Sequence, residues 1–282
     1  IFSFYDFVDH YNNTLNGKPI IIHGGSNYLL ENQFIGELLV LPTISQGTSE
    51  NITIKDVKCH GIVFFGGKNV LIKNVTVWNT TTAISGVFLD NITIEKLNST
   101  KNLFGISIGD SRDIIIKDSY VGESPIGIGI SRTSRVDISN VMLYNVPHGS
   151  LGVDNATQVT INDLTIFGGP ISIDGNRTVF ETFSISSSTL NNKEIKYFYD
   201  IADTTLTNED LGMLILGYSK NITVSNSSID YVYAKSITDL TIDKVEFFGP
   251  ADLPDIGYGG ISIEIKDSVN VALKQLNVNG ST

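Results

Sequence analysis

Two aspartates, Asp154 and Asp174, stand where a polysaccharide-cleaving site could use them. Each ends a short stretch of alternating apolar residues that begins near a glycine or proline. If these stretches are neighbouring strands of one sheet, the two carboxylates lie about 5 Å apart at the backbone. His148 and Arg132 would then lie within one repeat of them. Paired carboxylates with a histidine and an arginine are what acid and base catalysis of glycoside cleavage needs.

The same two aspartates have a simpler interpretation. Asp154-Asn155 and Asp174-Gly175 are residue pairs typical of turns. Turn residues of this kind are the more common finding, so the catalytic hypothesis and the structural interpretation both stay open on the sequence alone. We treat the chain as more consistent with a non-enzyme than with an enzyme.

Metal chemistry has weaker support. Asp110, Asp113 and Asp118 could bind a cation, but their spacing lacks the regular ligand order of a calcium loop. The four histidines are scattered along the chain, and Cys59 is the only cysteine, which excludes an intrachain disulfide and a multi-cysteine zinc site. We therefore expect no cofactor, with calcium as the alternative.

A repeat must position these residues. Similar segments, such as Asn-Ile-Thr-Ile-Lys-Asp-Val at Asn51 and Asn-Ile-Thr-Ile-Glu-Lys-Leu at Asn91, recur along the chain. Their starts at positions 51, 69, 91, 113, 135 and 158 are 18, 22, 22, 22 and 23 residues apart. A fixed period means one structural unit per repeat.

Each unit fits three short strands. Apolar and polar residues alternate, which is the two-residue period of a strand with one buried face. Asn and Asp recur at the bends, where they tolerate left-handed backbone geometry. The sequence therefore predicts an all-β, right-handed parallel β-helix of about ten rungs with an isoleucine-rich interior. The predicted inward residues are Ile52, Ile54, Ile72, Ile92, Ile94, Ile114, Ile116, Ile138 and Ile161.

Excursions near 11–50, 187–220 and 248–260 interrupt the repeat. The first two resemble each other: Thr-Leu-Asn-Gly-Lys at Thr14 returns as Thr-Leu-Asn-Asn-Lys at Thr189, 175 positions later. We expect a single domain over 1–282 that contains a duplication, with a first copy at about 1–180 and a partial second copy at about 181–282. Aromatic residues of the second copy could form a sugar-stacking or protein-contact surface, or belong to the core. They are Tyr197, Phe198, Tyr199, Tyr231, Tyr233 and Tyr258.

Composition narrows the function classes. The net charge of −11 argues against nucleic acid as a partner, since phosphate binding needs a basic face. No apolar run reaches the ~18 residues that a membrane span needs. The chain starts at Ile1 without a signal-peptide pattern, so we expect a mature chain or a fragment.

The repeat resembles the pectin-lyase-like superfamily of right-handed parallel β-helices. In particular, the Asn-Ile-Thr-Ile and Gly-Ile-x-Ile strands are similar to NosD-type and CASH-domain carbohydrate-associated surface proteins. The Asn16-Gly-Lys-Pro-Ile stretch before such a strand resembles archaeal cell-surface modules. The resemblance implies the fold, but this fold hosts lyases, hydrolases, adhesins and inert stalks. The chain lacks the paired Asp-Asp and the Gly-His-Gly of polygalacturonase-type hydrolases and has only Pro147-His148-Gly149.

Sequons are dense. The strand-start sequons are also the repeat consensus, whereas four others fall in expected turns and are the better candidates for N-glycosylation. These four are Asn79, Asn98, Asn155 and Asn176.

The leading hypothesis is an extracellular structural or adhesive module of a cell-surface protein, such as a surface layer, stalk or filament. The alternatives are a polysaccharide hydrolase or lyase, and a carbohydrate-binding module without turnover. Because a β-helix presents unpaired strand edges at both ends, we expect copies of itself or other cell-surface proteins as partners, and polysaccharide as a further one. We also expect the native polypeptide to extend beyond this chain, or another chain to cover those edges.

Overall fold

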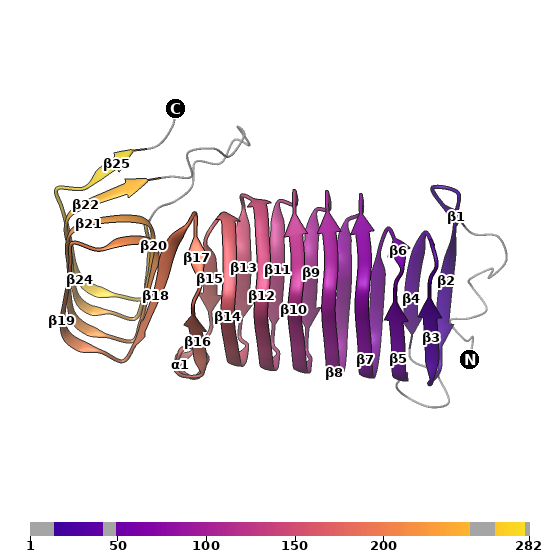
Figure 1. Cartoon of the computed structure of the whole chain (residues 1–282). Coiled ribbons are helices and arrows are strands. Elements are labelled where there is room, and N and C mark those ends of the chain that lie inside the picture. Colours follow the sequence, from indigo (N-terminus) through magenta and orange to yellow (C-terminus); the bar gives the residue numbers. More distant parts are fainter. Residues whose placement is uncertain (1–13, 42–48, 249–262, 280–282) are drawn as a thin grey trace.

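The computed structural model describes residues 14–41, 49–248 and 263–279. These residues form 25 strands and one short helix, and nearly all strand pairs are parallel. The chain is a parallel β-solenoid of about ten turns, which confirms the fold prediction. Figure 1 shows it as two coils that face different directions: the first is seen from the side and the second along its axis.

The first coil begins with a hairpin and then stacks rungs in the register that the repeat predicts. Strands of successive rungs pair residue for residue, for example Ile94 with Ile116 and Ile116 with Ile138. Its strands are β1 (Thr14–Leu15), β2 (Lys18–Gly24), β3 (Tyr28–Glu31), β4 (Glu37–Leu41), β5 (Glu50–Lys55), β6 (Lys58–Cys59), β7 (Ile62–Trp78), β8 (Thr82–Thr100), β9 (Phe104–Gly109), β10 (Arg112–Gly122), β11 (Ile126–Ser131), β12 (Ser134–Val146), β13 (Gly149–Asp154), β14 (Thr157–Gly168), β15 (Ile171–Asp174), β16 (Phe183–Ser186) and β17 (Thr189–Leu190), with helix α1 (Arg177–Glu181) between β15 and β16.

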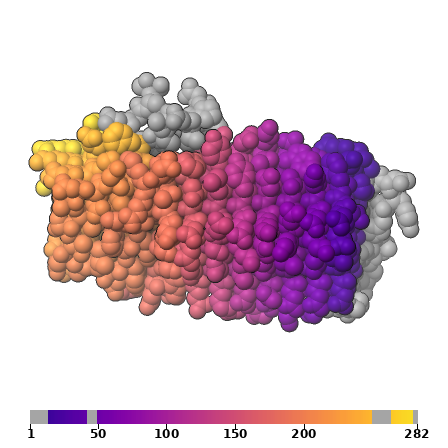
Figure 2. Space-filling model, viewed as in Figure 1, coloured from indigo at the N-terminus to yellow at the C-terminus, as the bar shows by residue number. Residues whose placement is uncertain are grey.

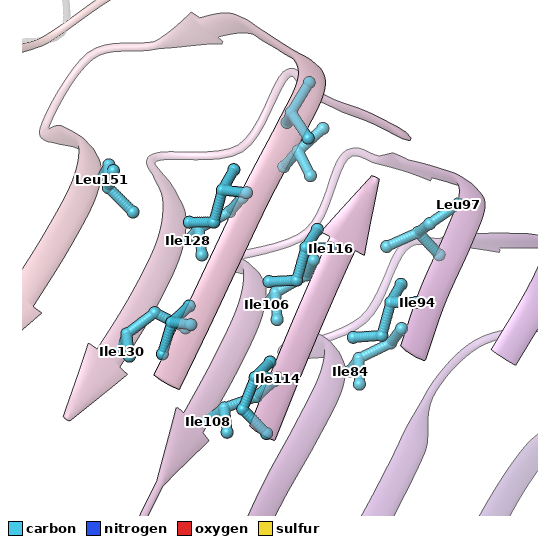
Figure 3. Close-up of a cluster of buried hydrophobic side chains, with 14 of the residues drawn as sticks. Ile84, Ile94, Leu97, Ile106, Ile108, Ile114, Ile116, Ile128, Ile130 and Leu151 are labelled. Carbon is cyan, nitrogen blue, oxygen red and sulfur yellow. The ribbon is translucent and has the colours of Figure 1, made fainter. Parts of the chain in front are cut away.

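The interior of the first coil is a stack of apolar side chains. All nine isoleucines that were predicted to point inward are fully buried. Figure 3 shows Ile94 beside Ile84, Ile116 beside Ile106 and Ile114 beside Ile108, each pair coming from facing strands. Each buried isoleucine gains roughly 1.5–3 kcal/mol relative to exposure, so these columns are the main source of stability.

The bends behave as the sequence predicts. Asn51, Asn69 and Asn91 all have positive φ angles and stand in one column. Their side chains form a ladder, in which the Nδ2 of each donates to the Oδ1 of the previous one over 2.9–3.1 Å. Asparagine tolerates the left-handed backbone and satisfies its own amide along the stack.

The second coil starts at β18 and has its own core. Its strands are β18 (Lys193–Tyr199), β19 (Ala202–Thr207), β20 (Asp210–Gly217), β21 (Lys220–Lys235), β22 (Thr238–Phe248), β23 (Ile263–Lys266), β24 (Val269–Lys274) and β25 (Asn277–Asn279). Leu214, Leu216, Val232 and Ala234 belong to this second core.

Two of the predicted excursions are therefore part of the solenoid. Residues 14–41 and 189–217 each form an antiparallel hairpin followed by parallel strands, so they begin a coil rather than interrupt one. The third was expected at 248–260; Phe248 ends β22, and the residues from 249 on lie outside the described residues. The stack is also not one straight rod, because outward residues of β20 and β21, such as Ile215 and Tyr233, pack with the core of the first coil. Figure 2 shows the second coil, in orange and yellow, in direct contact with the first on the face in view.

Candidate functional site

Asp154 and Asp174 are neighbours, as the strand alignment predicts. They end β13 and β15 and are register partners, so both side chains leave the same outward face of one sheet. Both residues are exposed. The Oδ1 of Asp154 accepts a hydrogen bond from Asn155 Nδ2 (2.8 Å), and the Oδ1 of Asp174 accepts one from the backbone N–H of Gly175 (2.8 Å).

A lysine from the second coil binds Asp174. Lys235 Nζ lies 2.6 Å from Asp174 Oδ1. The lysine side chain is only 9% exposed, whereas that of Asp174 is 58% exposed. The ion pair therefore joins a buried lysine to a carboxylate at the surface. The hydrogen bond from Lys235, followed by that from Gly175, holds the pKa of the Asp174 carboxyl below its usual range.

Arg132 joins the same edge but is already engaged. Its backbone N–H donates to the carbonyl of Asp154 (2.8 Å). Its guanidinium makes two hydrogen bonds of 2.7 Å to the two carboxylate oxygens of Asp110, one rung away. This bidentate pair lowers the pKa of Asp110. Arg132 thus stabilises a neighbouring rung rather than pointing a free cation at Asp154.

His148 does not join the cluster. It precedes β13, and Asp154 is the last residue of that strand. Six residues at about 3.3 Å each separate the two along the strand, so they lie roughly 20 Å apart. The structure therefore brings together Asp154, Asp174 and Arg132. His148 lies at the other end of strand β13.

The geometry permits only part of glycosidase chemistry. Carboxyl groups of retaining glycosidases lie about 5–5.5 Å apart, close to the spacing of adjacent rungs. A general acid, however, must hold its proton at working pH, which requires a raised pKa. Asp174 is shifted in the other direction, so it could act only as the ionised partner, and Asp154 would have to be the acid.

The three calcium candidates have other partners. Asp110 binds Arg132, Asp113 binds Arg135 (Nη2 to Oδ2, 2.6 Å) and Asp118 accepts from Asn140 Nδ2 (2.7 Å). Within the described ranges, no group of three or more histidine, cysteine or acidic residues is arranged to hold a metal ion. Among the same residues, no helix is long and apolar enough to span a bilayer.

The candidate glycosylation sites are all exposed. Asn79 and Asn155 lie at bends, and Asn176 caps the N-terminus of α1, where its Oδ1 accepts from the N–H of Thr178 (3.0 Å). The turn assignment was wrong for Asn98, which lies inside β8 and points outward from the sheet. The alternation there continues through the sequon, and this is the signal that should have marked it as a strand residue.

Most of the aromatic residues are not a sugar platform. Tyr197, Tyr231 and Tyr233 pack against the core of the first coil, and Phe198 packs into the second. Tyr258 lies outside the described residues. The core interpretation holds for these four, and Tyr199 is partly buried against the same first core. These five residues therefore do not form the exposed sugar-stacking surface that the carbohydrate-binding hypothesis needs.

Sequence reasoning missed Lys235 and the contact that carries it. We call this contact the junction: the outward face of β18, β20 and the end of β21 packs on the last rungs of the first coil. Phe180 stacks on Tyr233 (ring centroids 6.5 Å apart) and Phe183 meets Tyr197 edge-on (5.0 Å). Tyr197 Oη donates to the carbonyl of Phe180, inside the contact.

The junction has a polar rim. Tyr233 Oη donates to the carbonyl of Ile173, next to the Lys235–Asp174 ion pair. On another side, Arg177 binds Asp200 (2.9 Å) and donates to Tyr199 Oη (2.9 Å). An apolar centre with charged edges is the usual anatomy of a protein–protein contact.

No known protein family matches the sequence, and no curated protein matches it. Among solved structures, the chain is similar to an alginate lyase from Paenibacillus sp. str. FPU-7, with 10% identity, a TM-score of 0.34, and 93% of this chain and 92% of the lyase covered. It is also similar to the catalytic domain of a GH87 alpha-1,3-glucanase in complex with tetrasaccharides, with 11% identity, a TM-score of 0.29 and 95% of this chain covered. The chain spans 64% of that glucanase domain. At these scores neither structure assigns a function to the chain.

Proposed function

We propose that the chain is a non-catalytic, extracellular structural module of a cell-surface protein, built by docking one β-helix coil on the next. The observation that carries this proposal is the junction. A coil end that would otherwise expose apolar side chains is covered by the outer face of another coil, with Tyr233, Ile215 and Met213 buried between them.

The state of the candidate site supports the same proposal. Its charged groups satisfy one another across rungs: Asp174 with Lys235, and Asp110 with Arg132. Such pairs hold a surface in a fixed geometry, and they lower the pKa of Asp174 and of Asp110, whereas a general acid needs a raised pKa. The exposed sequons at Asn79, Asn155 and Asn176 fit a surface that carries glycans outside the cell.

The native protein tests this proposal. It should be labelled on intact cells by a reagent that does not cross membranes, and mass spectrometry should find sugar on at least one of Asn79, Asn98, Asn155 and Asn176. Recovery from the cell interior, with all four sites unmodified, would contradict the proposal.

A polysaccharide-acting enzyme is the second candidate, because Asp154 and Asp174 are register partners on an exposed sheet face. The two solved structures named above are an alginate lyase and an alpha-1,3-glucanase, which suggests alginate and alpha-1,3-glucan as first substrates to try. Purified chain should release no reducing ends or unsaturated products from either. Turnover that disappears in both Asp154→Asn and Asp174→Asn would establish the enzyme instead.

A further inference from the structure

Among the described strands of the second coil, β20 and the end of β21 carry large apolar residues on the outer face, where they meet the first coil. In β20, Met213 and Ile215 point toward the first coil, whereas Leu214 and Leu216 point into their own core. Tyr231 and Tyr233 of β21 also point toward the first coil, and they pair in register with Met213 and Ile215. A strand that is apolar on both faces is therefore the mark of the junction.

The beginning of the first coil has the same strand plan as the beginning of the second. In both, a two-residue strand turns back antiparallel onto a longer strand: Leu15 pairs with Lys18, and Leu190 pairs with Lys193. In both, a glycine is packed against the backbone of that turn. A Cβ on Gly36 would come within 2.7 Å of the carbonyl of Lys18, and one on Gly212 within 2.8 Å of the carbonyl of Lys193.

The registers of the following strands agree as well. Ile22 of β2 pairs with Leu39 of β4, as Tyr197 of β18 pairs with Ile215 of β20. Next to them, Leu38 pairs with Ile62, as Leu214 pairs with Val232. Each outward position of the junction thus has a counterpart at the start of the first coil.

These counterparts are mostly apolar. They form what we call the N-terminal face, which consists of Ile20, Ile22, Leu39, Leu41, Val63 and Phe65. None of the six is fully buried, and Phe65 is 49% exposed. Phe88 on the adjoining rung is 65% exposed and extends the apolar area. Glu37, which stands where Met213 does, is the charged position of this face.

The sequence on the N-terminal side repeats too. Phe4, Tyr5 and Val8 stand 175 positions before Val179, Phe180 and Phe183. The latter three are the buried residues of α1 and β16 that meet the second coil at the junction. The apolar pattern that ends a coil therefore precedes both faces in the sequence.

We propose that the N-terminal face docks the end of a second copy of the first coil, in the way that the second coil docks the end of the first. The partner is a β-helix coil that ends in residues of the same kind as Ile173, Val179 and Phe180. This inference rests on the proposed structural function and adds the surface and the partner through which the module is extended.

A tandem chain tests it directly: residues 1–175 are joined to the full chain 1–282, so that Gly175 precedes Ile1 as it precedes Asn176. Asp174 of the added copy should then face Phe65 of the full chain, since Phe65 is the counterpart of Lys235. A cysteine is placed at each position, and the pair is treated with a short bifunctional thiol reagent. Cys59 does not interfere, because it is fully buried and burial raises the pKa of its thiol to about 12.

Two other pairs calibrate the measurement. Asp174→Cys with Lys235→Cys inside the full chain is the reference for a formed junction, since the native side chains are 2.6 Å apart. Asp174→Cys of the added copy with Leu29→Cys is the matched control, because Leu29 is 55% exposed but lies on β3, which pairs with β5 and not with the strands of the N-terminal face. We expect the Phe65 pair to cross-link to the same extent as the reference, and the Leu29 pair to remain uncross-linked.

A second variant guards against a misfolded tandem. Leu39→Asp in the full chain should abolish the Phe65 cross-link and leave the reference cross-link intact. The inference is overturned if the Phe65 pair links no more than the Leu29 pair while the reference pair links fully. Its failure is separable from that of the proposed function: a docked tandem from a protein found unglycosylated inside the cell would refute the function alone. An undocked tandem from a glycosylated surface protein would refute the inference alone.

Discussion

Strands β9, β11, β13 and β15 of the first coil and strands β20 and β21 of the second all bury apolar side chains on their inward face. They differ in the residues on their outward face. In the first coil, Ser107, Gly129, Gly152 and Ser172 form one outward row in register, and all of them contact solvent. In the second coil, the outward positions of β20 and of the end of β21 are large and apolar, and they are buried against the first coil; these residues are Met213, Ile215, Tyr231 and Tyr233.

The difference separates two kinds of information in the sequence. Alternation of apolar and polar residues defines a rung and its core, and it is present in both coils. The character of the outward residues decides whether the sheet faces water or another coil. The inward residues of a strand thus specify the fold, and its outward residues specify whether the strand takes part in the junction.

The largest expected effect comes from the core that both coils share. Ile94→Ala should lower the free energy of unfolding by about 2–5 kcal/mol, because Ile94 is fully buried and its truncation leaves a cavity. Chemical denaturation measures the change. Ile115→Ala is the matched control: Ile115 lies on the same kind of strand but is 38% exposed, so its truncation should cost less than about 0.5 kcal/mol. Equal losses in both variants would contradict the assignment of inward and outward faces.

A smaller effect is expected at the junction. Tyr233→Phe removes only the hydroxyl that donates to the carbonyl of Ile173, and it leaves the ring stacked on Phe180. The loss of one buried hydrogen bond should lower the free energy of unfolding by about 1 kcal/mol. Tyr144→Phe, in a side chain that is 48% exposed, should leave the stability unchanged. An unchanged stability in Tyr233→Phe would mean that this hydrogen bond does not hold the coils together.

The fold could be predicted because its signals are local and repeated. The spacing near 22 and the asparagines at the bends fix the register of the stacked isoleucines. Asp154 was placed beside Asp174, 20 positions later, by aligning the ends of two short apolar strands that begin near a glycine and a proline. Lys235 could not be predicted by this route. Lys235 binds Asp174 although the two are 61 positions apart in the sequence. The repeat spacing gives the register within a coil, but it does not say how the second coil is oriented on the first.

One signal of the junction was present in the sequence. The segment from Leu211 to Leu216 is Leu-Gly-Met-Leu-Ile-Leu, which has no polar residue on either face of the strand. A strand that is apolar on both faces is covered on both sides. The aromatic residues of β21 also indicate a strand that is covered on both faces.

His148 precedes β13 whereas Asp154 ends it, so the two residues belong to one rung but lie at opposite ends of the strand.

The smallest effect concerns the ion pair at the rim of the junction, and it depends on pH. Asp174 has a lowered pKa in the folded protein because Lys235 and the N–H of Gly175 bind its ionised form. A carboxyl whose pKa falls on folding stabilises the fold above its unfolded pKa of about 3.9, and this stabilisation is lost as the pH falls through the lower, folded value. Asp174→Asn should therefore be less stable than the unmodified chain at pH 7, and the gap should close below about pH 4. The gap should stay under about 1 kcal/mol, because Asp174 is 58% exposed and water screens the pair. Thermal melts of both proteins between neutral and acidic pH measure this gap. A gap that persists unchanged in acid would show that Asp174 holds the coils together by the shape of its contacts and not by its charge.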